Sequence, residues 1–561
     1  MGTYDERSAG GRGGTLHHAP DAPGVRHTVL RSRSGRRSQS RRSTTVANEG
    51  SLTTRVLHLT AELWPYARTG GLGQAVAGLA DYQAGSGTES HVVLPLYREA
   101  RAHAGKIEPL TDPFTVEAGG RRQEVRCWHQ VGDDYPKTMF LEHNPSFDRP
   151  GIYGDAKGDY PDNPQRFALF ASAAIEIARR IGEGNLILHA HDWHAALVPV
   201  FLRRVYRDEP DLQRLPCVLT VHNGGFQGVY PFEVLKQIGL PDDMWSPEYM
   251  EWYGRLNYLK GGLHYADMVT TVSPTHAFEL LTDVGGFGLQ HSFRQLGDRL
   301  VGIRNGIDVD KWNPADDPDI VARFTADDMS GKARCKATLQ EAWGLPRRAD
   351  VPLFGMSARL VAQKGLDQIV ASQSLRLLDA QFIFLGAGEA QFETALRELA
   401  ARFPQRVGVN TAFTDTLEHH LLAGADFLMM PSLYEPCGLT QMRAQLYGAL
   451  PVARRVGGLA DTIEDGVTGI LYDAYSPDAF DHAVQRAVTL FQDRAWFSEL
   501  ARGAMRKDFS WRQPSELYAA VYRRAAAARL IPETSAADKG ERAPRKRSAR
   551  GKGGRGVNAR R

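Results

Sequence analysis

Several side chains that can take part in chemistry stand at the ends of short apolar runs. The clearest are Asp192 after residues 186–191, His222 with Asn223 at the end of residues 217–222, and Glu435 shortly after residues 427–430. Because loops at the carboxyl ends of parallel strands line a common crevice, these groups are expected to gather at one site. Carboxylate, imidazole and amide groups in such a crevice suit the binding of a polar ligand.

Two cations leave one apolar run together, in Ser357-Ala-Arg-Leu-Val-Ala-Gln-Lys-Gly365. Arg359 and Lys364 on one loop suit a departing diphosphate, whose negative charge grows as its bond to a sugar breaks. Two solvated cations before a helix would have the same pattern. Their place at the end of a strand favours the functional interpretation.

The most specific cluster is Tyr434-Glu-Pro-Cys-Gly-Leu-Thr-Gln441. A helix that begins here would leave the backbone N–H groups of Gly438, Leu439 and Thr440 free to face an anion. Glu435 would then accept hydrogen bonds from sugar hydroxyls or stabilise positive charge on a sugar ring. Taken alone, Glu435 would instead be read as a charge that complements a helix dipole. Cys437 has no evident His–Asn partnership and is interpreted as a small packing residue.

A glycine loop, Arg68-Thr-Gly-Gly-Leu-Gly-Gln74, follows the first apolar run. Adjacent glycines let backbone N–H groups approach a phosphate, and Arg68 could pair with a diphosphate through both arms of its guanidinium. A tight strand–helix turn with a solvated arginine explains the loop equally well. The segment Gly386-Ala-Gly388 also follows a strand but lacks the third glycine of a dinucleotide fingerprint, so it carries little weight.

Histidines are dense around residues 189–194, so a metal site has to be weighed. Strand alternation puts His189 and His191 on one face, but no partner cysteine or helical His-x-x-x-His is present. Buried, hydrogen-bonded histidines are therefore the preferred interpretation for at least two of them. His222 differs, because Asn223-Gly-Gly after it makes an opening suited to a ligand.

The elements that must position these groups form two series of apolar runs separated by helical patterns. The first series covers residues 56–60, 91–95, 186–191, 217–222 and 268–273, and the second covers 352–356, 381–385, 427–430 and 451–453. Strands that alternate with helices predict parallel sheets covered on both faces. Two series predict two doubly wound α/β domains, with a boundary near residues 305–308 and a ligand cleft between them.

The charge is unevenly distributed along the 561 residues, whose net charge is +3. Residues 1–50 carry +5 and residues 531–561 carry +7, which leaves −9 for the body. Both tails are poor in large apolar residues and are predicted to be disordered, with a transit peptide as the alternative for the first. An acidic body argues against nucleic-acid binding. Four scattered cysteines and the lack of long apolar runs predict a reducing compartment, no secretory signal and no membrane span.

Taken together, the ordered motifs resemble the bacterial glycogen synthase and plant starch synthase family over residues 55–525. The resemblance rests on residues 68–72, 160–163, 189–194, 220–223, 259–263, 272–275, 305–308, 357–360, 363–367, 435–441, 457–462 and 508–511. It implies a GT-B fold, in which two Rossmann-like domains face each other across a cleft. It also implies ADP-glucose as the donor, the non-reducing end of an α-1,4-glucan such as glycogen as the acceptor, and retention of the anomeric configuration. No metal or other cofactor is expected.

The resemblance assigns roles residue by residue. The residues expected in catalysis are Asp192, His222, Arg359, Lys364 and Glu435. Those expected to bind the donor are Arg68, Gly70, Gly71, Asn223, Asn305, Phe413, Cys437, Gly438, Leu439 and Thr440. Phe413 falls where the family has an aromatic residue that stacks on adenine. Two positions depart from the family pattern, since Arg68 replaces a common lysine and Gln74 replaces an aspartate.

The predicted organisation is a basic tail (1–50), an acceptor-side domain (51–305), a donor-side domain (306–505), a helix that returns to the first domain (506–530) and a second basic tail (531–561). The expected location is cytoplasmic, or plastid if the first tail is a transit peptide. Three alternatives stay open: a sucrose- or trehalose-type transferase, a glucan-binding protein that has lost catalysis, and nucleic-acid binding through the tails.

Overall fold

The computed structural model describes residues 54–132, 137–182 and 185–530. The two predicted basic tails, residues 1–50 and 531–561, lie outside these residues. None of the described helices has the length and apolar composition that a membrane span needs.

The first sheet has ten strands, and its parallel part has a doubly wound order. From β1 (Arg55–Leu59), the chain adds β2 (Glu89–Pro95) and β6 (Lys137–Glu142) on one side. On the other side it adds, in chain order, β9 (Leu186–His191), β10 (Cys217–Val221), β14 (Met268–Thr271) and β15 (Leu300–Gly302). The strand order therefore reverses between β1 and β9.

An antiparallel extension of this sheet departs from the expected all-parallel arrangement. It consists of β3 (Ile107–Pro109), β4 (Phe114–Ala118) and β5 (Arg121–Gln130), and β5 pairs antiparallel with β6. These strands are largely half-buried or exposed, with polar residues between apolar ones. Such strands suit a sheet edge that is solvated on one face.

The second sheet has six parallel strands in the order β18-β17-β16-β19-β20-β21. Their bounds are β16 Leu353–Ser357, β17 Gln381–Leu385, β18 Val407–Asn410, β19 Phe427–Met430, β20 Leu450–Arg454 and β21 Ile470–Tyr472. This is again the doubly wound order, and it reverses between β16 and β19. The strands are almost wholly buried because helices cover both faces of such a sheet.

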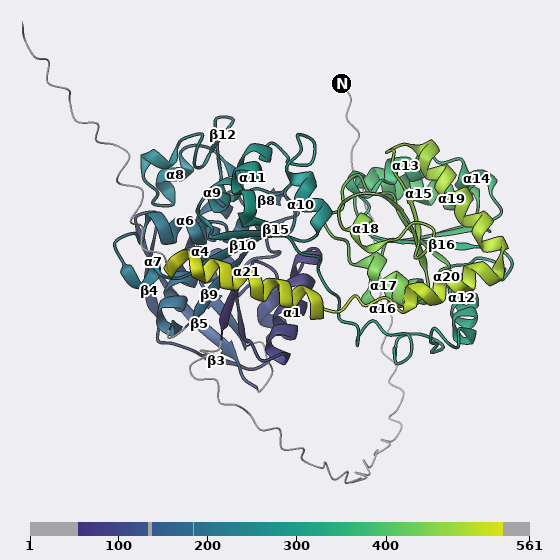
Figure 1. Ribbon diagram of the computed structural model, residues 1–561, viewed down its shortest axis with the longest axis horizontal. Coiled ribbons are helices and arrows are strands. Elements are labelled where there is room, and N and C mark those ends of the chain that lie inside the picture. Colours follow the sequence, from purple (N-terminus) through teal and green to yellow (C-terminus); the bar gives the residue numbers. More distant parts are fainter. Residues whose placement is uncertain (1–53, 133–136, 183–184, 531–561) are drawn as a thin grey trace, which may run out of the picture. The chain divides into compact units, whose positions relative to one another are not determined.

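The helices are numbered in chain order. The longer ones are α1 Gly71–Gly85, α4 Asn163–Ile181, α6 Leu197–Arg204, α9 Tyr258–Tyr265, α12 Ser330–Ala342, α15 Ala390–Arg402, α16 Asp415–Gly424, α19 Pro477–Gln492, α20 Arg494–Met505 and α21 Arg512–Leu530. The last of these, α21, is drawn in yellow in Figure 1 and contacts α1, β10 and β14 of the first sheet. Its buried Tyr518, Val521 and Tyr522 pack with Val56, Ile187 and Val218 from that sheet.

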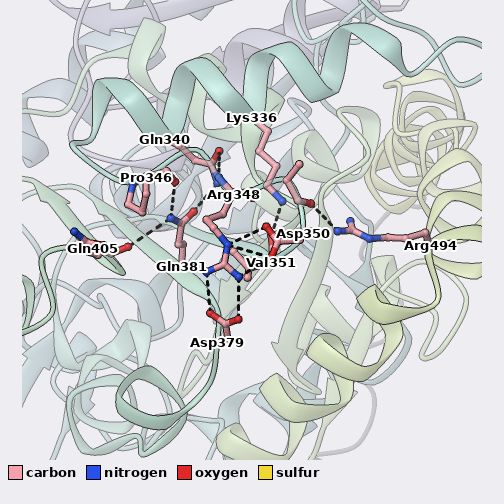
Figure 2. Close-up of polar contacts among 11 residues, drawn as sticks. Lys336, Gln340, Pro346, Arg348, Asp350, Val351, Asp379, Gln381, Gln405 and Arg494 are labelled. Atoms are coloured by element: carbon pink, nitrogen blue, oxygen red, sulfur yellow. Dashed lines mark hydrogen bonds and ion pairs between the residues drawn. The ribbon is translucent and has the colours of Figure 1, made fainter.

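A polar network anchors the amino-terminal ends of the strands of the second sheet (Figure 2). Arg348 pairs with Asp350 and Asp379, while the Gln381 amide donates to the Pro346 carbonyl and accepts from Gln340. Lys336 of α12 donates to the Val351 carbonyl at 2.6 Å. The network connects α12 to the loop before β16, at the amino-terminal ends of the strands and opposite the end that carries the cavity.

Candidate active site

One cavity of about 1280 Å³ collects residues from the carboxyl ends of both sheets. Its lining includes every residue that the sequence predicted for the site: Arg68, Gly70, Gly71, Asp192, His222, Asn223, Asn305, Arg359, Lys364, Phe413, Glu435, Cys437, Gly438, Leu439 and Thr440. Most of them follow β1, β9, β16 or β19, the strands next to the two order reversals, where doubly wound folds bind ligands.

Asp192 directly follows β9 and holds the loop after the neighbouring strand. Its backbone has a φ of 56°, in the left-handed region that non-glycine residues rarely occupy. Its Oδ1 accepts hydrogen bonds from the backbone N–H of His222 at 2.6 Å and of Asn223 at 3.3 Å. Burial raises the Asp192 pKa to about 7, despite these two bonds. Asp192 therefore positions the turn that carries His222.

The glycine loop is held by a carboxylate that the sequence did not single out. Glu62 accepts from the N–H groups of Thr69 at 2.8 Å and Gly70 at 3.2 Å, and from the Tyr153 hydroxyl at 2.7 Å. The Gly70 N–H is thus already bonded. Among the described residues, no acceptor bonds the N–H of Gly71, which leaves that group for a ligand.

Two side chains of the glycine loop reach the second domain. Arg68 forms a salt bridge with Asp415 of α16, with Nη2 and Oδ1 2.8 Å apart. Gln74 accepts a 2.8 Å hydrogen bond from Arg443, which also pairs with Glu418 and lies over the Trp312 ring. The two positions that depart from the family pattern therefore both bridge the cleft.

The acidic and basic groups of the second domain are directly paired. Lys364 Nζ lies 2.5 Å from Glu435 Oε2, which also accepts from Ser432 at 3.1 Å. Glu435 is 6% exposed. Arg359 is exposed to the cavity, and in the described part of the chain it has no ion-pair partner. It is therefore available to an anionic ligand.

The turn before α17 (Thr440–Leu446) is compact and depends on a glycine. Gly438 has a φ of 68°, and a Cβ there would lie 2.4 Å from Gln441 Oε1. No acceptor within the described residues bonds the N–H of Gly438, Leu439 or Thr440. Burial raises the Cys437 pKa to about 12, so its thiol is protonated and unsuited to nucleophilic attack.

The remaining predicted residues define the rest of the lining. Asn223 Oδ1 accepts from the Gly225 N–H at 2.9 Å, and Asn305 is buried near the chain's passage to the second domain. Phe413 is 43% exposed and stands just before α16. An exposed aromatic ring on the cavity wall can stack on a planar group.

Four cavity-wall or bridging residues were missed by the sequence analysis: Glu62, Tyr153, Asp415 and Arg443. Glu62 carries one usable signal, because it follows β1 closely. Asp415 and Arg443 lie on helices and Tyr153 lies in the loop before β7 (Gly154–Asp155), where an acid, an arginine or a tyrosine has no distinctive spacing. Their roles depend on partners far away in the chain.

Within the part of the chain that the structure describes, two groups of side chains have metal-ligand spacing, His58 with His189 and His191, and Asp317 with Asp319 and His419. In the first, every ring nitrogen already has a hydrogen-bond partner. In the second, His419 donates to Asp317 at 2.7 Å. Neither set includes a cavity-lining residue, so no step of the chemistry is assigned to a metal.

Two doubly wound domains that share one cavity fit the GT-B fold, and the family models show that the chain is a glycosyltransferase. Residues 55–295 match the family described as starch synthase catalytic domain, and residues 340–503 match glycosyl transferases group 1. The chain belongs to the glycogen synthase and starch synthase family.

The relatives in this family match nearly along their whole length. A glycogen synthase from Anaeromyxobacter sp. is 42% identical over 480 residues, which cover 84% of this chain and 99% of that one. A glycogen synthase from Thermodesulfovibrio yellowstonii is 37% identical, with 83% and 96% covered. The catalytic domain of starch synthase IV from Arabidopsis thaliana, bound to ADP and acarbose, has a TM-score of 0.77 at 30% identity, with 85% and 100% covered. The predicted fold, family and enzyme class are therefore confirmed.

Proposed function

We propose that the protein transfers glucose from ADP-glucose to the non-reducing end of an α-1,4-glucan and so elongates glycogen. The observation that carries this proposal is the shared cavity, whose wall includes Arg359, the backbone N–H groups of Gly438, Leu439 and Thr440, and His222. Arg359 and the N–H groups suit a diphosphate, and His222 suits a sugar. The starch synthase that resembles this chain holds ADP and acarbose, ligands of these two kinds.

The donor diphosphate would lie between the two domains. Arg359 and Lys364 supply positive charge from the second domain, and the Gly71 N–H supplies a donor from the first. These groups interact more strongly as negative charge builds on the leaving diphosphate, so they lower the barrier rather than only tightening binding. Lys364 would then exchange part of its contact with Glu435 for the phosphate.

The glucosyl ring would lie against Glu435 and His222. The Glu435 carboxylate favours the positive charge that develops on the ring as the bond to the diphosphate breaks. His222 is neutral, because burial lowers its pKa to about 3, and it can hydrogen-bond a ring hydroxyl. Asp192 acts through the backbone of His222 as a positioning residue.

In the transfer step the bond between the anomeric carbon and the diphosphate oxygen breaks. A new bond from that carbon to the acceptor hydroxyl oxygen forms on the same face, which retains the configuration. The hydroxyl proton passes to an oxygen of the departing ADP. The enclosing domains exclude water, which would otherwise hydrolyse the donor.

The base of the donor is expected to stack on Phe413. We predict a preference for ADP-glucose over UDP-glucose with glycogen as the primer, because a purine offers a larger stacking face. Phe413→Ala should raise the KM for ADP-glucose about tenfold, which is ~1.4 kcal/mol and within the range of aromatic pairs plus lost area. Equal or faster turnover of UDP-glucose by the wild type would contradict the donor assignment.

Arg68 offers a second test of the donor site. Its bridge to Asp415 is about one-third exposed on both sides, so the bridge is worth less than about 1 kcal/mol. We expect Asp415→Asn to change the KM for ADP-glucose less than about fivefold. Arg68→Ala should raise it about tenfold or more, because a charge-assisted bond to phosphate contributes ~1.5–3 kcal/mol.

Steady-state kinetics on glycogen measure both effects. If the two variants raised the KM equally, Arg68 would act only by bridging the cleft to Asp415, and its assignment to the donor would be wrong.

A further inference from the structure

A row of buried histidines runs from the centre of the first sheet to the cavity. His58 lies on β1, His191 lies on β9, and His222 follows β10. His58 Nδ1 lies 3.0 Å from His191 Nε2, and His191 Nδ1 lies 3.0 Å from His222 Nε2. His58 and His191 are at most 1% exposed. The row thus connects the interior of the domain to a ring on the cavity wall.

The far end of the row meets two side chains from helices that cover this face of the sheet. His58 Nε2 lies 2.9 Å from Oε1 of Gln83 on α1. The Gln83 amide nitrogen donates to the Tyr522 hydroxyl of α21 at 3.0 Å. Tyr522 is in turn 2.9 Å from His189 Nδ1. Each ring of the row therefore has both of its nitrogens bonded, except for His222.

The rings of the row are uncharged, since burial lowers the pKa of His58 to about 4 and of His222 to about 3, and the His191 pKa lies well below its ordinary value. A neutral imidazole has one N–H donor and one acceptor nitrogen. Each nitrogen–nitrogen bond holds one hydrogen. A choice made at one end of the row therefore fixes the tautomer of every ring along it.

The orientation of the Gln83 amide makes that choice. Its oxygen accepts from His58, so His58 carries hydrogen on Nε2 and accepts at Nδ1 from the Nε2–H of His191. His191 must then accept at Nδ1 from the Nε2–H of His222. A flipped amide would move the hydrogen from Nε2 to Nδ1 on all three rings.

Tyr522 links the amide to a second histidine of the sheet. In the orientation that the structure shows, the tyrosine hydroxyl accepts from the Gln83 nitrogen and donates its own hydrogen to His189 Nδ1, and His189 donates from Nε2 to the Thr220 hydroxyl, 2.6 Å away. This arrangement satisfies every group in the set, as would the one with every hydrogen bond reversed. The orientation of the Gln83 amide, whose oxygen lies on His58 and accepts from Ser90 at 3.5 Å, selects the first.

We propose that Gln83 and Tyr522 are positioning residues that act through His58 and His191 to hold His222, a residue of the cavity wall, as its Nε2–H tautomer with Nδ1 as an acceptor. Among the described residues, none bonds Nδ1 of His222. The ring would accept a hydrogen bond from a hydroxyl of the glucosyl unit and would present no N–H to it. This step rests on the proposed function for its ligand, but the tautomer itself belongs to the free enzyme.

The test begins with NMR of the full chain, with ¹⁵N-labelled histidine and the His222 signals assigned from His222→Gln. We expect Nδ1 of His222 at the shift of an unprotonated nitrogen. Gln83→Met removes both the acceptor and the donor, and Tyr522→Phe removes one oxygen with little change of shape. Both should populate the second His222 tautomer and lower kcat on ADP-glucose and glycogen about fivefold to tenfold, with KM changed less than twofold.

Val521→Ala is the matched control, because Val521 is buried on the same face of α21 but has no place in the row. It should keep the tautomer and a kcat within twofold of the wild type. A protonated Nδ1 in the wild type, or an unchanged tautomer in both variants, would overturn the proposal. If the tautomer shifts as expected but the enzyme has no activity on ADP-glucose, the link from Gln83 and Tyr522 to His222 is confirmed and the proposed function is wrong. Tyr522→Phe decides the matter if Gln83→Met does not fold.

Discussion

Lys364→Ala and Glu435→Gln are each expected to lower kcat on ADP-glucose and glycogen by about 10²–10³-fold, with a smaller change in KM. Loss of one positioned charge contact in such a site costs about 3–4 kcal/mol in the transition state. The direct 2.5 Å contact between the two side chains adds a second expectation. Because each variant also leaves the other member unpaired, the double variant should lose less than the product of the single losses.

A matched pair on the surface serves as the control. Lys507 and Glu464 are 3.3 Å apart with side chains 44% and 61% exposed, so Lys507→Ala and Glu464→Gln should keep nearly full kcat. Circular dichroism checks that the site variants are folded. If both folded variants keep more than about a tenth of the wild-type kcat, a loss below ~1.4 kcal/mol, the pair has a structural role and the assignment to the donor is wrong.

The central strands and the ends that carry chemistry could be predicted because they leave a local signal. Buried parallel strands are short apolar runs, and the polar residue that follows each run is visible in the sequence. For example, residues 186–191, 381–385 and 427–430 were predicted with the observed bounds. Strand β5 was missed because it mixes charged residues with isolated apolar ones, as an edge strand does.

The pairing of side chains across the fold could not be predicted in the same way. Alternation along β9 indicated that His189 and His191 share a face, and their rings are 4.2 Å apart. Nothing local links His189 to Tyr522, which is 333 residues away. The Lys364–Glu435 contact likewise depends on how two loops meet, so the sequence predicted two charges around a ligand and not their direct contact.

Five histidines in or directly after β1, β9 and β10, namely His58, His189, His191, His194 and His222, should make the protein lose stability in mild acid. Burial lowers the pKa of His58 to about 4 and of His222 to about 3, and those of His189, His191 and His194 lie well below the ordinary value. The unfolded chain takes up protons at these groups near pH 6.5, whereas the folded chain does not. Their contribution to stability is therefore fully present above pH 6.5 and is lost as the pH falls toward 4.

The buried carboxyl of Asp192 opposes this trend over the same range. Its pKa is raised to about 7 in the folded state, so it releases a proton on unfolding between about pH 4 and pH 7. Asp81, whose pKa burial raises to about 6, acts in the same sense as Asp192. The histidines outnumber these two carboxyls, so unfolding takes up protons near pH 5 and the free energy of unfolding should fall as the pH decreases, by ~1.4 kcal/mol per pH unit for each net proton taken up.

Urea unfolding at pH 7.5, 6 and 5 measures this slope. His194→Phe keeps a ring against Tyr153, which stacks on His194 at 4.6 Å, but it cannot titrate. It should reduce the slope by about 1.4 kcal/mol per pH unit near pH 5, because one proton fewer is taken up on unfolding. A free energy of unfolding that stays constant from pH 7.5 to pH 5 would contradict this prediction, because it would mean that these rings take up protons equally in the folded and the unfolded protein.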